Sequence, residues 1–477
     1  MASYYIDSYA GSDFIDQTHS TFSDGVFKAT TGTSGSNELT KTGAFSGLYA
    51  GDIIRLQDDG SGDVVVASYE IAHVVSTDVI RLTADITGGA TETVSDVKAV
   101  VHTANESLPY GNITTFMASG ISIVANDIIY IGNDKECKHR AGLTNGWTWS
   151  NVTTSNQAQA ISIQAYAPGN SGGAAFVKTR ADGTTTPIAK INGNGNSYIT
   201  STGTSGKYCG FVGIEFYNTT NWLIVSSQGW SFVDCKFHDG TGSYLVFGTG
   251  QGNAFINCEF DGTDTGSSTA ALYLNFAGTV HGSYFHDFNH DMIDIINSTA
   301  TISFNLFENI GISAIKFNDR DYINIEYNTF IGTNDNVIGL WIWNAGSYQN
   351  HIRHNIFANF GGTGTNPAGV TGGTGIYIEP NSNCSILGPN AFYNNTNDVD
   401  NDGGYNPMLE FTNVSLSSDP FVDASAGDYA LDTGSDAFAS TDNMTLDDSE
   451  TKLSYGAVQQ VQAGGGGGQT SHVSVGG

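Results

Sequence analysis

The sequence has little of what a helical or membrane protein needs. Lys, Arg, Asp and Glu together make up 13% of the 477 residues, against roughly 25% in a typical soluble domain. Helices with solvated Glu and Lys faces are therefore not expected. No apolar run approaches the roughly 18 residues needed to span a bilayer, so a membrane protein is not expected either.

Basic residues are scarcer than acidic ones. The 17 Lys and Arg face 47 Asp and Glu, which gives a formal net charge of −30. A surface this negative repels phosphate backbones and anionic lipids, so we expect neither a nucleic-acid nor a membrane partner. The first residues contain no basic stretch followed by an apolar run. No secretory signal is visible, so either a signal has been removed or the chain is released by another route such as cell lysis.

Cysteine and proline are also rare, with 5 and 8 residues. An odd number of cysteines without short spacings indicates buried thiols rather than a disulfide framework or a metal site. The cysteines are Cys137, Cys209, Cys235, Cys258 and Cys384.

What the sequence does contain is a repeat. Phenylalanine recurs every 21 to 35 residues, and another apolar residue stands five positions before each one. Two hydrophobic columns in register indicate one structural unit copied along the chain. The phenylalanines are Phe216, Phe237, Phe260, Phe285, Phe307, Phe330, Phe357 and Phe392. The second column is Phe211, Phe232, Phe255, Val280, Ile302, Ile325, Ile352 and Leu387.

Within each repeat apolar and polar residues alternate at period two, which predicts strands. Gly, Asn, Asp and Thr lie between them and supply turns. A short unit of three strands that stacks on its own copies is one coil of a parallel β-helix. Stacking places equivalent residues roughly 4.8 Å apart. We therefore expect Phe on Phe inside, and an amide ladder of Asn305, Asn328 and Asn355 at a turn.

On these columns the chain resembles the right-handed parallel β-helix proteins, which include pectate lyases, other polysaccharide-degrading enzymes and bacteriophage tailspikes. The resemblance covers roughly residues 110–455 and includes the closing stretch Asp419-Pro420-Phe421-Val422-Asp423. It implies the fold more specifically than the chemistry, since one fold hosts many functions.

The fold class expected is therefore all-β, a right-handed parallel β-helix with a small N-terminal antiparallel β domain. That domain, residues 1–105, contains similar strands at 51–56 and 78–82 flanking Val64-Val65-Val66. It would cap the edge of the first coil, because an unpaired strand edge invites aggregation. The β-helix is expected over 106–420 and a closing segment over 421–460. A flexible glycine-rich tail over 461–477 follows, with an ordered interface segment around Gly464–Gly468 as the alternative.

One strand of each coil carries two rows of side chains that must point outward, because neighbours in a strand alternate between faces. The first predicted row is Val246, Tyr273, Asp294, Lys316, Trp341 and Tyr377. The second is Gly248, Asn275, Ile296, Asn318, Trp343 and Glu379.

These rows offer rings on which sugars can stack and polar groups that can bind hydroxyls. The equivalent strands carry the substrate groove in the pectate-lyase-like relatives, so the resemblance implies a glycan here. The predicted glycan-binding residues are Tyr273, Asn275, Asn318, Trp341, Trp343, Tyr377 and Glu379. Packing of the same rings against a neighbouring loop or subunit remains open.

Asp294 and Lys316 lie on adjacent coils of this row and are the catalytic candidates. A lysine with a lowered pKa would abstract the proton α to a uronic acid carboxylate while the aspartate positions it. A plain surface salt bridge is the alternative. Lyases of the family present a larger carboxylate cluster for calcium, and this chain departs from that pattern. Hydrolysis would need two carboxylates, for which Asp291, Asp294, Asp319, Asp321 and Glu379 are candidates.

Two acidic segments are candidates for metal binding. Asp398, Asp400 and Asp402 followed by Gly403 match the first half of an EF-hand-like calcium loop, although Leu409 stands where a closing Glu should be. No cofactor is otherwise expected; Ca²⁺ at these three aspartates is the exception. The segment 286–291 holds two His and two Asp, and we interpret it as a solvated turn rather than a metal cluster.

Two functions of different class follow. The first is a bacteriophage virion surface protein, a spike, fibre or decoration subunit, whose rigid shaft binds host glycans or other virion proteins. It would be a homotrimer, as related tailspikes are, and would lie on the virion surface or outside the cell. The second is a polysaccharide lyase or glycoside hydrolase acting in a groove along the β-helix. A convergent acid/base set would distinguish the enzyme.

Overall fold

The computed structural model describes the backbone of the strands named below and the side chains of most coils. Side chains are described over 127–132, 162–165, 188–193, 209–219, 229–248, 252–275, 277–296, 299–317, 322–332, 336–343, 350–380, 385–402, 412–425 and 428–432, with shorter pieces at 38, 75–76, 78–82, 382, 435 and 437. Within this part of the chain no helix is long and apolar enough to cross a membrane.

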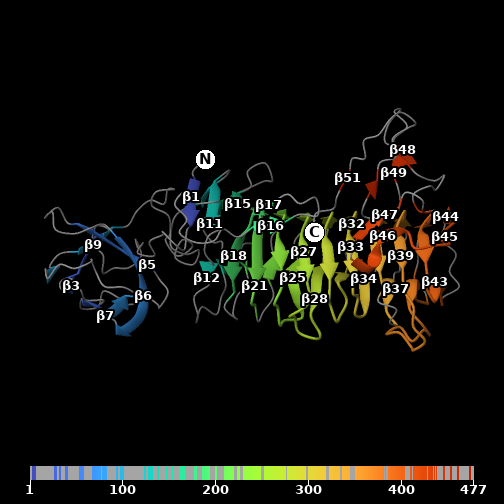
Figure 1. Cartoon of the computed structure of the whole chain (residues 1–477), viewed down its shortest axis with the longest axis horizontal. Coiled ribbons are helices and arrows are strands. Elements are labelled where there is room, and N and C mark those ends of the chain that lie inside the picture. Colours follow the sequence, from blue (N-terminus) through green and yellow to red (C-terminus); the bar gives the residue numbers. More distant parts are fainter. Residues whose placement is uncertain are drawn as a thin grey trace. The chain divides into compact units, whose positions relative to one another are not determined.

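The chain forms two compact units (Figure 1). The first comprises Met1–Lys178, Pro187–Ser197 and Lys207–Glu215. The second comprises Thr179–Thr186, Tyr198–Gly206 and Phe216–Gly477.

The first unit combines parallel and antiparallel strands. Its parallel stack runs β1 (Ser3–Ile6), β11 (Ile128–Gly132), β15 (Ile161–Tyr166), β20 (Cys209–Val212). Its antiparallel sheet runs β2 (Val26–Ala29), β9 (Val97–Val100), β5 (Ile53–Asp58), β6 (Ala67–Ser76), β7 (Val79–Leu82), β4 (Glu38–Thr40). A small antiparallel N-terminal sheet is thus confirmed. The pairing of β1 with β11 was not predicted, and the predicted strand Val64–Val66 lies outside the described residues.

The second unit is the predicted parallel β-helix, in which three sheets run along the stack of coils. The first sheet holds β23 (Trp230–Val233), β26 (Asn253–Ile256), β29 (Gly278–His281), β32 (Ala300–Ser303), β35 (Ile323–Glu326), β38 (His351–Arg353), β41 (Ile386–Leu387) and β44 (Leu409–Glu410). The second holds β24 (Lys236–Phe237), β27 (Glu259–Asp261), β30 (Tyr284–His286), β33 (Leu306–Glu308), β36 (Thr329–Ile331), β39 (Ile356–Ala358), β42 (Ala391–Tyr393) and β45 (Val414–Ser415). The third holds β22 (Leu223–Val225), β25 (Tyr244–Gly248), β28 (Ala270–Leu274), β31 (Ile293–Ile296), β34 (Ser313–Asn318), β37 (Ile338–Trp343), β40 (Thr374–Ile378) and β43 (Asn397–Asn401).

The phenylalanine column forms the core of this unit. Each ring stacks on the ring of the next coil along the second sheet, with centroid separations between 4.4 and 5.3 Å. The column five residues earlier is also buried and lines the first sheet. The two columns read from the sequence are therefore confirmed as the interior of the coils.

The thiols follow the prediction where the structure describes them. Cys209, Cys235 and Cys258 are buried, and burial raises the pKa of the Cys209 thiol above its ordinary value. The side chains of Cys137 and Cys384 lie outside the described residues.

The predicted amide ladder stands at the turn between the first and second sheets. Asn305 donates from Nδ2 to Asn328 Oδ1 at 2.9 Å, and Asn328 donates to Asn355 Oδ1 at 3.0 Å. The ladder also continues beyond the predicted residues, from Asn355 to Asn390 and from the Asn390 backbone to Asn413. Because each amide also bonds backbone groups, the ladder satisfies polar atoms that the coil stacking buries.

The outward row of the third sheet differs from the prediction by one residue at its start. Val246 is fully buried, and Phe247 faces Tyr273 in the register with the two rings stacked at 4.4 Å. Val246 and Phe247 are both apolar, so period two alone could not decide which one faces inward. From Tyr273 onward the predicted row holds.

The closing segment folds back over the second sheet. Strands β46 (Phe421–Asp423) and β47 (Asp428–Leu431) pair antiparallel, and Tyr429 packs with outward residues of late coils such as Ile331 and Ala358. Tyr429 Oη also donates to Glu308 Oε1 at 2.5 Å. The closing segment therefore covers the late coils of this sheet. The predicted tail residues Gly464–Gly468 lie outside the described residues.

Candidate functional site

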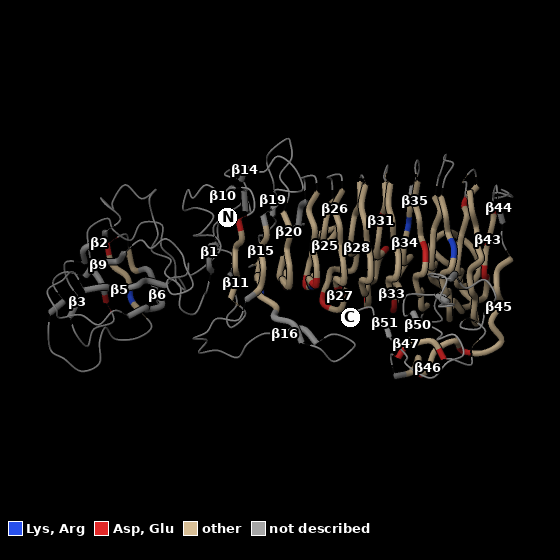
Figure 2. The backbone as a smooth tube through the Cα atoms, turned by 90° about the horizontal axis from the view of Figure 1, so that it is seen from above, with Lys and Arg blue, Asp and Glu red and all other residues tan. Residues whose placement is uncertain are grey.

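The outward face of the third sheet gathers most of the predicted site residues. The register pairs Tyr273 with Asp294, Asp294 with Lys316, Lys316 with Trp341 and Trp341 with Tyr377. Asp400 of β43 continues the row beyond Tyr377. Figure 2 shows how few Lys and Arg positions lie along the stacked strands, so the ammonium of Lys316 is an uncommon feature of this surface.

Asp294 lies near the centre of this row and is mostly buried. Tyr244 of β25, two coils away, donates a hydrogen bond from Oη to Asp294 Oδ2 at 3.0 Å. Burial raises the pKa of Asp294, and the nearby charge of Asp291 raises it further, whereas the Tyr244 hydrogen bond and the charge of Lys316 act in the opposite direction. The net pKa of Asp294 is above its ordinary value. This carboxyl therefore keeps its proton to higher pH than an exposed aspartate does.

Lys316 is directed toward Asp291 and two indole rings. Its Nζ lies 3.9 Å from Asp291 Oδ2, 4.4 Å from the ring centroid of Trp341 and 4.8 Å from that of Trp343. Asp291 is 4% exposed and accepts a hydrogen bond of 2.6 Å from Ser313 Oγ. The predicted partners Asp294 and Lys316 thus have adjacent backbones, but the close ion pair is with Asp291.

Two of the predicted glycan-binding rings are covered. Trp341 is 9% exposed and Tyr377 is 3% exposed, and both pack in a cluster with Ala368 and Val370 of the loop that precedes β40. For these two rings the alternative left open by the sequence, packing against a neighbouring loop, is therefore the one observed. The loop is an insertion in this coil. The alternation of apolar and polar residues along a strand indicates which side chains point outward, but not whether an inserted loop covers them. Trp343 stays exposed at 36%.

The remaining predicted glycan-binding residues have different surroundings. Tyr273 and Asn275 are half-buried, and burial with the charge of Asp294 raises the pKa of Tyr273. Glu379 Oε1 accepts a hydrogen bond of 3.1 Å from Trp341 Nε1, so it helps hold that ring. The side chain of Asn318 lies outside the described residues, as do Asp319 and Asp321.

The acidic segment at 398–402 is not the predicted calcium loop. Asp398 and Asp400 lie on the extended strand β43, with Asp402 just beyond it. The loop geometry predicted for the three aspartates is therefore wrong, and calcium binding by them stays a prediction. Burial raises the pKa of Asp398, and burial together with the charge of Asp402 raises that of Asp400.

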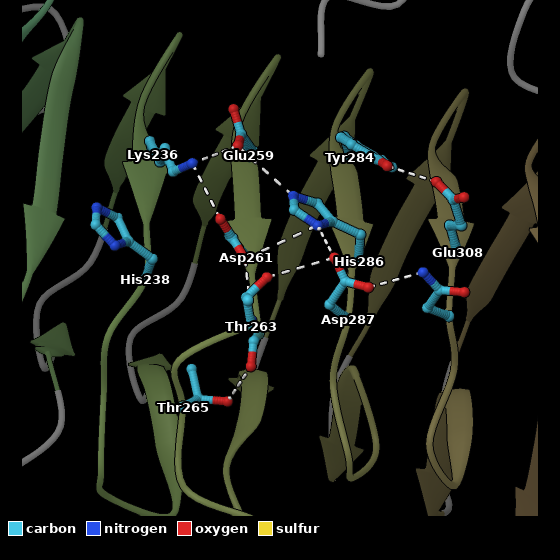
Figure 3. A network of polar contacts seen from close by, with 12 residues as sticks. Lys236, His238, Glu259, Asp261, Thr263, Thr265, Tyr284, His286, Asp287 and Glu308 are labelled. Atoms are coloured by element: carbon cyan, nitrogen blue, oxygen red, sulfur yellow. Dashed lines mark hydrogen bonds and ion pairs between the residues drawn. The ribbon is translucent and has the colours of Figure 1, made fainter. Parts of the chain in front are cut away.

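A second polar site, which the sequence analysis missed, lies on the outward face of the second sheet (Figure 3). Lys236 Nζ lies 2.7 Å from Glu259 Oε1 and 3.1 Å from Asp261 Oδ2. His286 of the next coil approaches both carboxylates, with Nε2 3.6 Å from Glu259 Oε1 and Nδ1 3.8 Å from Asp261 Oδ1. We call Lys236, Glu259, Asp261 and His286 the second-sheet cluster.

The charged groups of this cluster shift one another's pKa values. Burial would raise the pKa of Asp261, but hydrogen bonds from Thr263 and Lys236 outweigh it and lower the pKa to about 2. Burial would lower the pKa of His286, but Glu259, Asp287 and Asp261 outweigh it and the net pKa is raised.

The segment 286–291 does not form a single turn cluster. His286 ends β30 on the second sheet, whereas Asp291 contacts Ser313 and Lys316 beside the third sheet. Its two ends therefore contribute to two separate sites.

No family model and no curated protein matches the chain, but solved structures resemble it. The pectate lyase Pel9A has a TM-score of 0.49 at 12% identity over 74% of this chain and 92% of its own. A mannuronic acid specific polysaccharide family 6 lyase from human gut microbiota has a TM-score of 0.36 at 14% identity over 61% and 76%. A GH87 α-1,3-glucanase catalytic unit from Streptomyces thermodiastaticus has a TM-score of 0.27 at 9% identity over 81% and 90%.

Proposed function

We propose that the chain is a polysaccharide-cleaving protein whose site is the outward face of the third sheet, with Asp294 as the proton donor. The observation that carries this proposal is the raised pKa of a carboxyl that a tyrosine holds in place beside a second carboxylate. Pairs of carboxyl groups with unlike surroundings are how one site supplies both an acid and a base.

The chemistry that fits this pair is glycoside hydrolysis. Asp294 would protonate the glycosidic oxygen as the bond to the leaving sugar breaks. Asp291 would be the second carboxyl group of the pair, which accepts a hydrogen bond from Ser313 and faces the ammonium of Lys316. Trp343 offers the exposed ring on which a sugar can stack.

Elimination by Lys316 fits the geometry less well. Its Nζ lies over two indole rings and near a carboxylate, so it already has three partners on this face. A base needs an available lone pair to abstract a proton. We therefore place Lys316 in substrate orientation and in support of Asp291.

The test is incubation of the purified chain with acidic and neutral polysaccharides. New reducing ends without unsaturated products are expected, because hydrolysis adds water across the bond and elimination leaves a double bond. Unsaturated products lost in Lys316→Ala would instead establish elimination. Absence of any product, with every glycan tried, would contradict cleavage.

Trp343→Ala is expected to raise KM about two- to tenfold with little change in kcat, since a stacked ring contributes roughly 0.5–1.5 kcal/mol. Tyr322→Ala is the matched control, because this ring is 56% exposed next to β35 of the first sheet. Equal effects of the two variants would exclude Trp343 as a specific sugar contact.

A second candidate function is glycan binding without cleavage, as on a bacteriophage surface protein. The observation that favours it is the exposed ring of Trp343, which can stack on a sugar whether or not the bond is cleaved. Retention on a glycan column that Trp343→Ala abolishes, with no product formed, is the expected result of this function. Sedimentation as a homotrimer would support the virion role, and a monomer at micromolar concentration would count against it.

A further inference from the structure

His286 in the second-sheet cluster is oriented by a carboxylate. Its Nδ1 lies 2.8 Å from Asp287 Oδ2, and because a carboxylate accepts, Nδ1 carries the proton. Asn309 Nδ2 donates to the other oxygen of Asp287 at 2.7 Å and holds that carboxylate in place. A carboxylate behind a histidine ring is the arrangement that orients histidines for metal binding.

The other ring nitrogen of His286, Nε2, faces a carboxylate. Nε2 is buried and makes no hydrogen bond to the described residues, and Glu259 Oε1 lies 3.6 Å from it. When Nε2 carries no proton, its lone pair lies beside two carboxylates and can bind a cation.

The three potential ligands are close enough for one ion. One oxygen each of Glu259 and Asp261 and one ring nitrogen of His286 lie within 4.8 Å of one another. Figure 3 shows these side chains pointing toward one another from adjacent coils of the second sheet. A donor set of nitrogen and carboxylate oxygen suits Zn²⁺ and its neighbours, whereas Ca²⁺ takes oxygen ligands.

We propose that Glu259, Asp261 and His286 bind a divalent transition ion such as Zn²⁺, and that Lys236 competes with it. The ammonium of Lys236 contacts both carboxylates, so it provides positive charge where the ion would lie. The Lys236 side chain is 25% exposed and can swing into solvent when the ion binds. The ion would link neighbouring coils on a different sheet from the proposed cleavage site.

The experiment is a calorimetric titration of the EDTA-treated full chain with ZnCl₂, alongside melting curves. One Zn²⁺ per chain and a melting temperature that rises with Zn²⁺ are expected. His286→Ala and Asp261→Asn should each weaken binding at least about tenfold. Lys236→Met should tighten binding about three- to tenfold, because it removes the ammonium that competes with the metal for both carboxylates.

The controls separate this site from adventitious binding and from misfolding. His238→Ala removes a histidine just after β24 on the same sheet and should leave Zn²⁺ affinity unchanged. Circular dichroism of each variant without metal checks the fold, and Lys236→Met tests the site by a gain rather than a loss. No binding below millimolar Zn²⁺ in both wild type and Lys236→Met would overturn the proposal. Binding unchanged in His286→Ala, or selective for Ca²⁺, would overturn it as well.

Discussion

Asp294→Asn is expected to lower the rate of polysaccharide cleavage about 10²- to 10⁴-fold, the range typical of losing a general acid. The same change is expected to raise the melting temperature at neutral pH. An amide keeps the oxygen that accepts from Tyr244 but carries no charge to be buried beside Asp291. Loss of activity with a gain in stability is the pattern of a residue kept for function at a cost to the fold.

The pH dependence of that stability gain follows from the direction of the pKa shift. Asp294 has a folded pKa above its ordinary value of 3.8, so over the interval above 3.8 the folded chain binds more protons than the unfolded chain. Wild-type stability therefore falls as pH rises from 3.8 through the raised pKa. The asparagine variant lacks this loss. The difference in melting temperature between Asp294→Asn and wild type should grow as the pH rises from 3.8 to the raised pKa of Asp294, and it should stay constant above that pKa.

The matched control is Asp264→Asn, which removes one negative charge from an exposed turn of the same unit. It should leave both cleavage and the pH profile of the melting temperature close to wild type. If Asp294→Asn instead lowers the melting temperature at neutral pH, the carboxyl is ionised and held by Lys316 in the folded state. It could not then be the proton donor.

The fold was predictable because stacking repeats one set of interactions many times. The phenylalanine column and the amide ladder each place one residue type at one position of every coil. The sequence of each coil therefore shows the same residue types at the same positions, and the pattern can be recognised from the repeats alone. The outward row from Tyr273 to Tyr377 was identified for the same reason.

What the sequence did not reveal lies where coils differ from one another. The loop that covers Trp341 and Tyr377 is unique to its coil, so nothing in neighbouring repeats predicts where it packs. The direction of a long side chain such as Lys316 depends on charges two or three residues away on other strands. The strand register determines which residues lie beside the backbone of Lys316, but it does not determine which groups the ammonium contacts.

The second-sheet cluster did leave a signal in the sequence. Its members stand immediately before or after the repeated phenylalanines: Lys236 before Phe237, Glu259 and Asp261 around Phe260, and His286 after Phe285. These are outward positions of adjacent strands, so aligning the repeats and reading down the flanking columns would have found them. A search for short motifs could not, because the residues are dispersed over three coils.

Asn328→Ala is expected to be among the most destabilising single changes in the β-helix. It removes the Oδ1 atom that accepts from both the backbone and the side chain of Asn305, and the Nδ2 group that donates to the Ile302 carbonyl. Each buried group left unpaired costs about 1–3 kcal/mol. A loss of roughly 3 kcal/mol in the free energy of unfolding is expected, measured by chemical denaturation of the purified chain.

Asn324→Ala in the same coil serves as its control. Asn324 faces outward from β35 and is half-buried, so its truncation should change stability by less than about 0.5 kcal/mol. Asn328→Asp tests the mechanism further, because an aspartate keeps the acceptor but cannot donate to the Ile302 carbonyl unless it is protonated. It should destabilise at neutral pH and recover toward wild type as the pH falls. A loss in Asn328→Ala no larger than in Asn324→Ala would mean that stacked rings alone hold the coils in register.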